Sequence, residues 1–239
     1  VEIYGSWFNL TWYRPPEERR PAARVLAPVY EALLREHGCL GGIVRRHRRN
    51  PHQRQLVAET TVVGEAPPDR FLVTESGLSY EISLTRTQHS GLFLDQRDSR
   101  RRIARLAPGR RLANLFAYTC SFSVAAAAAG AEVAFSVDVS GPGLGAGKRN
   151  FAANGLSESG RGKFIQQDVR KWLRRQLRRR LDSQRLLDVV ICDPPVFAAS
   201  REGGRFSLER EWPFLAATIA AVLAPDGAAL FANNHRAGD

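Results

Sequence analysis

Two patterns of apolar and polar residues divide the chain near residue 110. Beyond it, short apolar runs alternate with amphipathic segments. The apolar runs predict strands over 112–117, 132–138, 163–168, 187–193 and 228–232. The segments between them predict helices over 122–129, 169–181 and 212–223. Alternating strands and helices are typical of a doubly wound parallel sheet, so the predicted fold class is α/β.

The first 86 residues contain shorter elements. Residues 7–13 have the composition of a strand, and an apolar stripe over 25–34 predicts a helix that Gly38 ends. Apolar runs on either side of Glu75-Ser76-Gly77 predict a hairpin. We therefore expect a small α+β region over 1–86 and a larger domain over 87–239. The chain has no methionine and stops at Asp239 without an obvious terminal element, which predicts truncation at the C-terminal end.

The composition excludes several classes of protein. Of the 239 residues, 44% are hydrophobic, which supports a packed core and excludes a disordered chain or a small disulfide scaffold. Cys39, Cys120 and Cys192 form no Cys-x-x-Cys pair, so we expect reduced thiols in a cytoplasmic protein and no metal site. Polar residues interrupt the uncharged stretch 112–131, so we expect no membrane span.

The chain is strongly basic. Lysine and arginine number 35 against 24 acidic residues, and the net charge of +11 predicts a polyanionic partner. Three basic clusters are candidates for phosphate contacts, although a solvated surface explains each of them as well. The cluster beside an extended segment contains Arg45, Arg46, Arg48 and Arg49. The other two are Arg100, Arg101 and Arg102 with Arg105, and the arginine-rich face of the helix predicted over 169–181.

Acidic residues close three successive strands of the predicted sheet. These residues are Asp138, Asp168 and Asp193. The carboxyl ends of parallel strands form the ligand-binding edge of a doubly wound sheet, so the three side chains mark a candidate site. Glycines at 141, 143 and 145 superficially resemble a dinucleotide-binding loop. They miss the spacing of that motif, and Asp138 directly before them would repel a pyrophosphate.

The turn after the first strand of the sheet is a better candidate for the cofactor loop. Asp138 follows Phe116 by 22 residues, close to the spacing of about 20 at which a carboxylate accepts hydrogen bonds from ribose hydroxyls. The loop lacks the glycines that a phosphate requires. These features favour a nucleoside cofactor without a pyrophosphate, and S-adenosylmethionine is the obvious candidate.

Seven sequence blocks then point to a known family. They span 91–97, 114–119, 122–124, 137–140, 150–156, 164–168 and 193–197. With them the chain resembles the class I methyltransferases that modify bacterial large-subunit ribosomal RNA, which include cytosine-C5 and guanine-N7 enzymes. The resemblance covers about 71–236. Residues 7–13 and 43–56 are similar, more loosely, to the region before the catalytic domain of the guanine-N7 enzymes.

The resemblance implies a Rossmann-like methyltransferase sheet and a set of cofactor-binding residues. The turn of Phe116, Ala117, Tyr118 and Thr119 would face the methionine moiety. Asp138, next to Val139, would hold the ribose hydroxyls. The adenine edge would meet Asp168, with Gln167 and Val169 on either side. Phe93 and Arg97 would cover the cofactor or bind its carboxylate. Cys120 stands where the family usually has glycine, which leaves open that its side chain crowds the cofactor.

The resemblance also implies a catalytic set: Asp193, Pro194, Phe197 and Asn233. Asp193 and the prolines after it would form the floor where the methyl donor meets the base. Phe197 would stack on the base, unless it is a core aromatic. Asn233 would contact the base edge, although asparagines at strand ends also form turns.

The missing cysteine indicates which atom accepts the methyl group. Cytosine C5 needs a thiolate that adds to C6, and in the cytosine branch this cysteine follows the fifth strand. Residues 231–236 contain none, and alternation along its strand should turn Cys192 away from Asp193. Guanine N7 carries no proton and needs no general base, because its lone pair attacks the sulfonium methyl directly and the sulfur leaves as a thioether. Large-subunit ribosomal RNA is therefore the favoured substrate, and guanine N7 is the favoured site of methylation. The alternatives are cytosine C5, a small molecule, and a non-catalytic RNA-binding protein.

Overall fold

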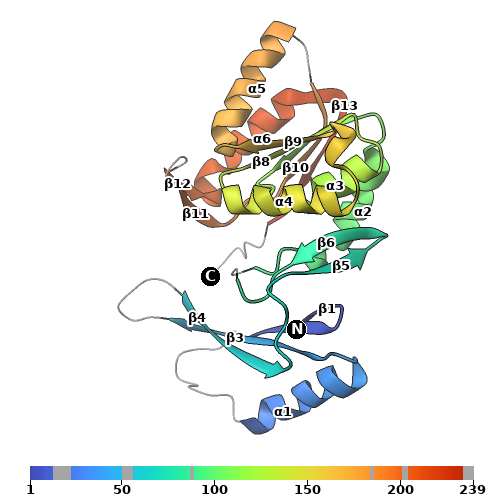
Figure 1. The fold of residues 1–239 in the computed structure, drawn as a ribbon. Helices are drawn as coiled ribbons and strands as arrows, with labels where there is room; N and C mark the ends of the chain where they lie inside the picture. The colour runs from blue at the N-terminus through green and yellow to red at the C-terminus, as the bar shows by residue number, and fades with distance from the viewer. Residues whose placement is uncertain (13–22, 50–55, 87–88, 184–185, 201–203, 234–239) are drawn as a thin grey trace. The chain divides into compact units, whose positions relative to one another are not determined.

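The computed structural model describes residues 1–12, 23–49, 56–86, 89–183, 186–200 and 204–233 (Figure 1). They group into two compact units. The first contains Val1–Val73 and Glu81–Leu94, and the second contains Thr74–Tyr80 and Asp95–Asp239. The main division therefore falls at Leu94, a few residues later than the sequence suggested, and the tip of the predicted hairpin belongs to the second unit.

The second unit is built on a five-stranded parallel sheet. Its strands are β7 (Arg111–Leu115), β8 (Val133–Asp138), β9 (Gly162–Gln166), β10 (Leu187–Cys192) and β13 (Leu223–Phe231). Their order is β13-β10-β7-β8-β9, and every neighbouring pair is parallel. This confirms the five predicted strands and the doubly wound α/β fold. The strand order reverses between β7 and β10, which is where such sheets bind ligands.

Helices cover both faces of this sheet (Figure 1). One face carries α2 (Arg97–Leu106), α3 (Ser121–Ala128) and α4 (Gly141–Ala153), and the other carries α5 (Val169–Ser183) and α6 (Leu208–Val222). Side chains alternate between the two cores: Ile191 packs toward Phe122 of α3, and Cys192 packs toward α5 and α6. Short elements complete the unit: η2 (Leu94–Gln96), η3 (Ser157–Ser159), β11 (Phe197–Ser200) and β12 (Gly204–Ser207).

The sequence pattern did not predict α4, because its first turns are rich in glycine. The helix begins nevertheless at a good cap. The Ser140 hydroxyl accepts a hydrogen bond from the Gly143 N–H at 3.1 Å, and Pro142 occupies the first turn, where no helical donor is lost. The glycines therefore belong to a helix rather than to a phosphate-binding loop.

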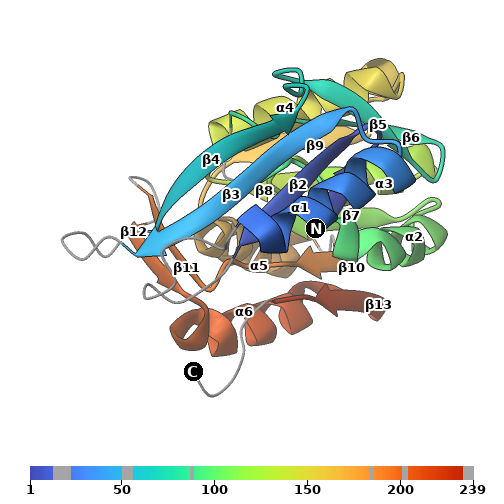
Figure 2. The ribbon, with the colours of Figure 1, turned by 90° about the horizontal axis from the view of Figure 1, so that it is seen from below.

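The first unit contains a four-stranded sheet with order β1-β2-β3-β4. Its strands are β1 (Glu2–Tyr4), β2 (Trp7–Trp12), β3 (Gly41–Arg49) and β4 (Leu56–Gly64). The parallel pair β2–β3 is joined through α1 (Ala23–Glu31) and the π-helical turn η1 (Ala32–Glu36). Figure 2 shows α1 lying along these strands, and Leu33 of η1 packs on Phe8 and Val44. The predicted helix and its end at Gly38, whose φ is +62°, are confirmed.

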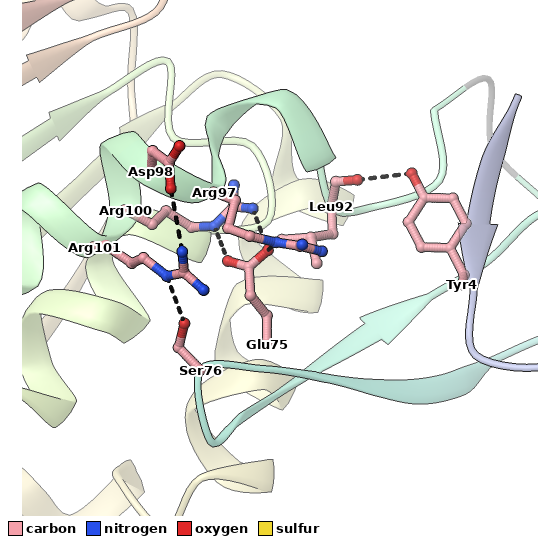
Figure 3. Close-up of polar contacts among 8 residues, drawn as sticks. All are labelled: Tyr4, Glu75, Ser76, Leu92, Arg97, Asp98, Arg100 and Arg101. Atoms are coloured by element: carbon pink, nitrogen blue, oxygen red, sulfur yellow. Dashed lines mark hydrogen bonds and ion pairs between the residues drawn. The ribbon is translucent and has the colours of Figure 1, made fainter.

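The predicted hairpin is formed by β5 (Phe71–Glu75) and β6 (Leu78–Ile82). Ser76 and Gly77 both have positive φ, as a tight two-residue hairpin turn requires. Within the second unit the tip is held at two places. Glu75 receives hydrogen bonds from Arg100 at 2.7 and 2.9 Å and from Arg97 at 3.1 Å (Figure 3). The Asn154 side chain pairs with both backbone groups of Ser79.

Arg100 is therefore not the phosphate contact that the sequence suggested. Its side chain is only 2% exposed, because it is buried against Glu75. Arg101 is also engaged, with Ser76 and Asp98 (Figure 3). Burial raises the pKa of the Glu75 carboxyl, but the hydrogen bonds and charges of Arg100 and Arg97 outweigh it and lower the pKa below its ordinary value.

The first unit also contains a buried side-chain hydrogen bond. The Tyr4 hydroxyl donates to the Leu92 carbonyl at 2.9 Å (Figure 3).

We predict that Glu75→Gln lowers the free energy of unfolding of the second unit by about 3–5 kcal/mol at pH 7, because it leaves the Arg100 charge buried without a counter-charge. Urea denaturation measures this. Asp98→Asn, which removes an exposed partner of Arg101, should cost far less. Folding lowers the Glu75 pKa, so the difference between wild type and Glu75→Gln should shrink as the pH falls below 4.5, the ordinary value of this carboxyl. Equal losses of unfolding free energy in Glu75→Gln and Asp98→Asn would contradict the role of Glu75 as the counter-charge of Arg100.

Candidate active site

The loop that follows β7 has an unusual backbone. Phe116, Tyr118 and Cys120 have φ values of +57°, +45° and +62°, a region that non-glycine residues rarely adopt. Each such residue costs about 1–2 kcal/mol. Hydrogen bonds hold the loop in this form: Ala117 N–H donates to the Val137 carbonyl at 3.1 Å, and Cys120 N–H donates to the Ala117 carbonyl at 2.7 Å. Backbone strain of this kind concentrates at functional sites.

Asp138 at the end of β8 joins this loop to α4. One carboxylate oxygen accepts from Tyr118 N–H at 2.8 Å, and the other accepts from Ser140 N–H at 2.7 Å. Each carboxylate oxygen can accept a second hydrogen bond, so the group has acceptor capacity left for ribose hydroxyls. Val139, next in the chain, uses its carbonyl to accept from Gln166.

Cys120 points beneath the loop, toward α4. Its side chain is fully buried with Ala117, Leu144 and Phe164. A Cβ built on Gly147 would collide with its sulfur, so the thiol occupies space that this glycine leaves. Burial raises the pKa of the Cys120 thiol to about 12, which keeps it protonated at neutral pH. The structure thus accommodates a side chain at the position where the family usually has glycine.

Asp168 at the end of β9 is the cap of α5. Its carboxylate accepts from the N–H groups of Arg170 and Lys171 at 2.9 and 3.2 Å, and it forms an ion pair with the Arg170 guanidinium at 2.8 Å. Arg170 also pairs with Glu211 of α6 at 2.7 Å. Burial opposes ionisation of Asp168, but these bonds outweigh it and lower its pKa. The sequence did not indicate that Arg170 engages this carboxylate.

The two neighbours of Asp168 differ in their surroundings. The Gln167 side-chain oxygen accepts a bond from Arg175, and its backbone N–H donates to the Asp138 carbonyl at 2.9 Å. Val169 is buried in the core beneath α5 and α6. The backbone bond of Gln167 links the ends of β8 and β9, which brings the predicted ribose and adenine residues to one edge of the sheet.

Asp193 follows β10 at the point where the strand order reverses. Burial raises the pKa of its carboxyl, and the negative charge of Asp95 in η2 raises it further. Asp95 was not among the predicted site residues. Pro194 is buried, whereas Phe197 at the start of β11 is 74% exposed. The alternative that Phe197 is a core aromatic is therefore wrong.

The hairpin that carries Phe197 packs against the loop that follows β7. Leu208 N–H donates to the Val196 carbonyl at 3.0 Å at the base of the hairpin. Phe206 of β12 lies against Phe116 of the loop, with ring centroids 5.2 Å apart. The hairpin that carries Phe197 thus contacts the loop of Phe116 through Phe206.

Three further predicted site residues lie outside the strand ends described above. Asn233 is exposed, two residues beyond the end of β13. Arg97 lies at the start of α2 and bonds Glu75 through its Nε. Phe93 belongs to the first unit, where its ring lies 5.5 Å from His89. The proposed roles of these three residues stay predictions.

Of the four predicted arginines on β3, only Arg45 has a side chain that the structure describes. Arg45 is only 5% exposed and donates to the Leu84 carbonyl at 2.5 Å, so it supports the first unit instead of facing a partner. This corrects the expectation that all four arginines are phosphate contacts. Arg46, Arg48 and Arg49 pair with Glu59, Val57 and Leu56 of β4 through their backbone, and their side chains lie outside the described structure.

We predict that Gly147→Ala lowers the stability by about 1–3 kcal/mol, because the added methyl overlaps Cys120. It should also weaken binding of S-adenosylhomocysteine, because the loop that ends at Cys120 must shift. Calorimetric titration and thermal denaturation measure the two effects. Adding Cys120→Gly should restore both, since the nearest remaining neighbour is the Thr119 carbonyl at 3.3 Å.

Gly145→Ala is the matched control in the same helix, because its methyl would meet only Arg149 at 3.7 Å. It should leave binding unchanged. Additive effects of Gly147→Ala and Cys120→Gly, without rescue, would contradict the packing described for this pair.

Comparison with known proteins identifies the family. Residues 16–238 match the family of S-adenosylmethionine-dependent methyltransferases. A ribosomal RNA large subunit methyltransferase K/L of Pseudomonas paraeruginosa is 35% identical over 99% of this chain and 31% of its own length. A ribosomal RNA large subunit methyltransferase K of Neisseria meningitidis is 33% identical over 99% of this chain and 65% of its own length. The chain thus spans 31% and 65% of the length of these two relatives.

A solved structure shows a similar fold. SMU.776, a methyltransferase crystallised with SAH, is 28% identical and has a TM-score of 0.77, covering 97% of this chain and 56% of its own. No helix among the described residues is long and apolar enough to cross a membrane. In the same residues, no group of three or more histidine, cysteine, aspartate or glutamate side chains is placed to hold a metal ion. The chain belongs to the S-adenosylmethionine-dependent methyltransferase family.

Proposed function

We propose that this chain methylates N7 of a guanine in large-subunit ribosomal RNA, in the cytoplasm. The observation that carries the proposal is the site at the end of β10. There a half-buried carboxylate, Asp193, precedes an exposed aromatic ring, Phe197, and the neighbouring cysteine is buried. The names of the curated relatives support ribosomal RNA as the substrate, and the net charge of +11 supports a polyanion.

The cysteines argue against cytosine C5. That reaction needs an ionisable thiol close to the base. Cys192 and Cys120 are fully buried, and burial raises the pKa of each thiol to about 12. Cys39 is also buried and belongs to the first unit. None of the three cysteines of this chain is therefore suited to attack a pyrimidine.

The residues present suit S-adenosylmethionine. Asp138 has free acceptor capacity for the ribose, and the backbone strain at 116–120 marks a functional loop. When bound there, the cofactor supplies a methyl group activated by its sulfonium. Arg97, at the start of α2, is proposed to bind its carboxylate.

Asp193 and Phe197 would act on the base. Phe197 offers an open ring on which a guanine can stack, which orients N7 toward the methyl group. Methylation at N7 leaves positive charge on the purine ring. The Asp193 carboxylate is half-buried, where charges interact more strongly than in water, so it would stabilise this developing charge.

The proposal is tested by incubating the chain with S-adenosylmethionine and protein-free large-subunit ribosomal RNA. Mass spectrometry of the digested RNA should detect 7-methylguanosine. Phe197→Ala should raise KM for RNA about tenfold, within the range of base stacking on an aromatic ring. Its affinity for S-adenosylhomocysteine should not change, because the ring is exposed.

Leu106→Ala, at another exposed apolar residue of the second unit, is the control and should leave KM unchanged. Formation of 5-methylcytidine, or methylation of free nucleotides but not of RNA, would overturn the proposed substrate.

The charge of Asp95 should set the pH dependence. Asp193 stabilises the product charge only when ionised, so the rate should fall as the pH drops through its raised pKa. Asp95→Asn removes one cause of that raised pKa, and the acidic limb of the kcat profile should move to lower pH. Asp98→Asn, three residues further on, should leave the limb in place. A limb that does not move in Asp95→Asn would exclude Asp193 as the titrating group.

A further inference from the structure

The helix α5 carries more basic residues than any other helix of the second unit, seven among its fifteen residues. Its sequence, VRKWLRRQLRRRLDS, buries Val169, Trp172 and Leu173 against the sheet. Lys171, Arg174 and Arg178 are exposed, and their spacing of three and four residues places them along one side of the helix. The helix therefore has an apolar inner face and a basic outer stripe, which we call the α5 stripe and define by these three residues.

This arrangement opposes helix stability. Arg170, Arg174 and Arg178 follow one another at intervals of four residues, and so do Lys171, Arg175 and Arg179. Like charges at this spacing repel, and basic residues in the first turn oppose the helix dipole. A basic run that departs in this way from local stability rules marks a candidate functional surface.

Internal partners neutralise only part of this charge. Arg170 is used by Asp168 and Glu211, and Arg175 bonds Gln167. Among the described residues, no ion pair to an acidic side chain involves Arg174 or Arg178. The Arg174 guanidinium lies 4.6 Å from the ring centroid of Phe214 on α6. A guanidinium held on an aromatic ring keeps its N–H edge free for a phosphate and loses little entropy on binding.

We infer that the α5 stripe is a contact surface for the phosphate backbone of RNA. The inference rests on the proposed function and deepens it, because it places part of the RNA-binding surface on the catalytic unit itself. α5 begins at Val169, directly after Asp168, and Arg170 in its first turn contacts Arg205 and Phe206 of the hairpin that carries Phe197. RNA whose target base is at Phe197 can therefore continue along α5. The contact is to phosphates, so it contributes affinity without reading the base sequence.

The test compares two variants that each remove two positive charges. Arg174→Gln/Arg178→Gln changes the α5 stripe. Arg102→Gln/Arg105→Gln changes two exposed arginines of α2, on the opposite face of the sheet. Binding of a fluorescein-labelled 20-nucleotide single-stranded RNA is measured by anisotropy between 50 and 200 mM KCl. The slope of log K against log salt should become shallower by about 1.4 in the α5 variant, at about 0.7 for each phosphate contact. It should stay at the wild-type value in the α2 variant.

Titration with S-adenosylhomocysteine checks that both variants fold, and its affinity should match that of the wild type. An unchanged slope in the α5 variant, or an equal change in both, would overturn the inference, since the second result reflects net charge alone. If the wild-type chain binds S-adenosylhomocysteine but binds RNA without salt dependence, the proposed RNA substrate fails together with the stripe. If the wild-type slope is steep and only the α5 result fails, the proposed function stands.

Discussion

The hydrogen bonds of the Asp138 carboxylate are the interaction on which the site depends. One oxygen holds Tyr118 of the loop after β7, and the other holds Ser140 at the start of α4. The loop contains three non-glycine residues with positive φ, so it would relax without such support. The same carboxylate keeps acceptor capacity for the ribose that we propose it binds. Support of the loop and the proposed binding of the cofactor therefore involve the same side chain.

Close packing beneath the loop imposes a second constraint. Cys120 adopts a backbone conformation that glycine adopts more readily, and its side chain occupies the space above Gly147. The loop thus carries a side chain where the helix has none. The Asn150 side chain adds a bond to the Thr119 carbonyl at 3.0 Å, which ties α4 to the same turn. Hydrogen bonds and side-chain packing therefore connect the loop, β8 and α4 to one another.

Arginine serves two purposes in this chain. Three arginines are directed inward. Arg45 binds a backbone carbonyl, and Arg100 binds Glu75. Arg170 binds both Asp168 and Glu211. The guanidinium group suits this use because it is always charged and has donors in a fixed fork. Other arginines, such as Arg174 and Arg178, remain on the surface. The net charge of +11 therefore overstates the positive charge that is exposed to a polyanion on any one face of the protein.

Local sequence was sufficient for the five strands of the parallel sheet, the hairpin turn at Ser76-Gly77 and the acidic residues at the strand ends. Apolar periodicity and turn chemistry act over a few residues, so they can be read without tertiary contacts. The glycine-rich start of α4 was missed because a cap at Ser140 outweighs poor propensity. The inward direction of Arg45 and Arg100, the exposure of Phe197, and the influence of Asp95 on Asp193 were decided only by the tertiary structure. Burial and charge coupling depend on residues distant in sequence, and only the folded chain brings those together.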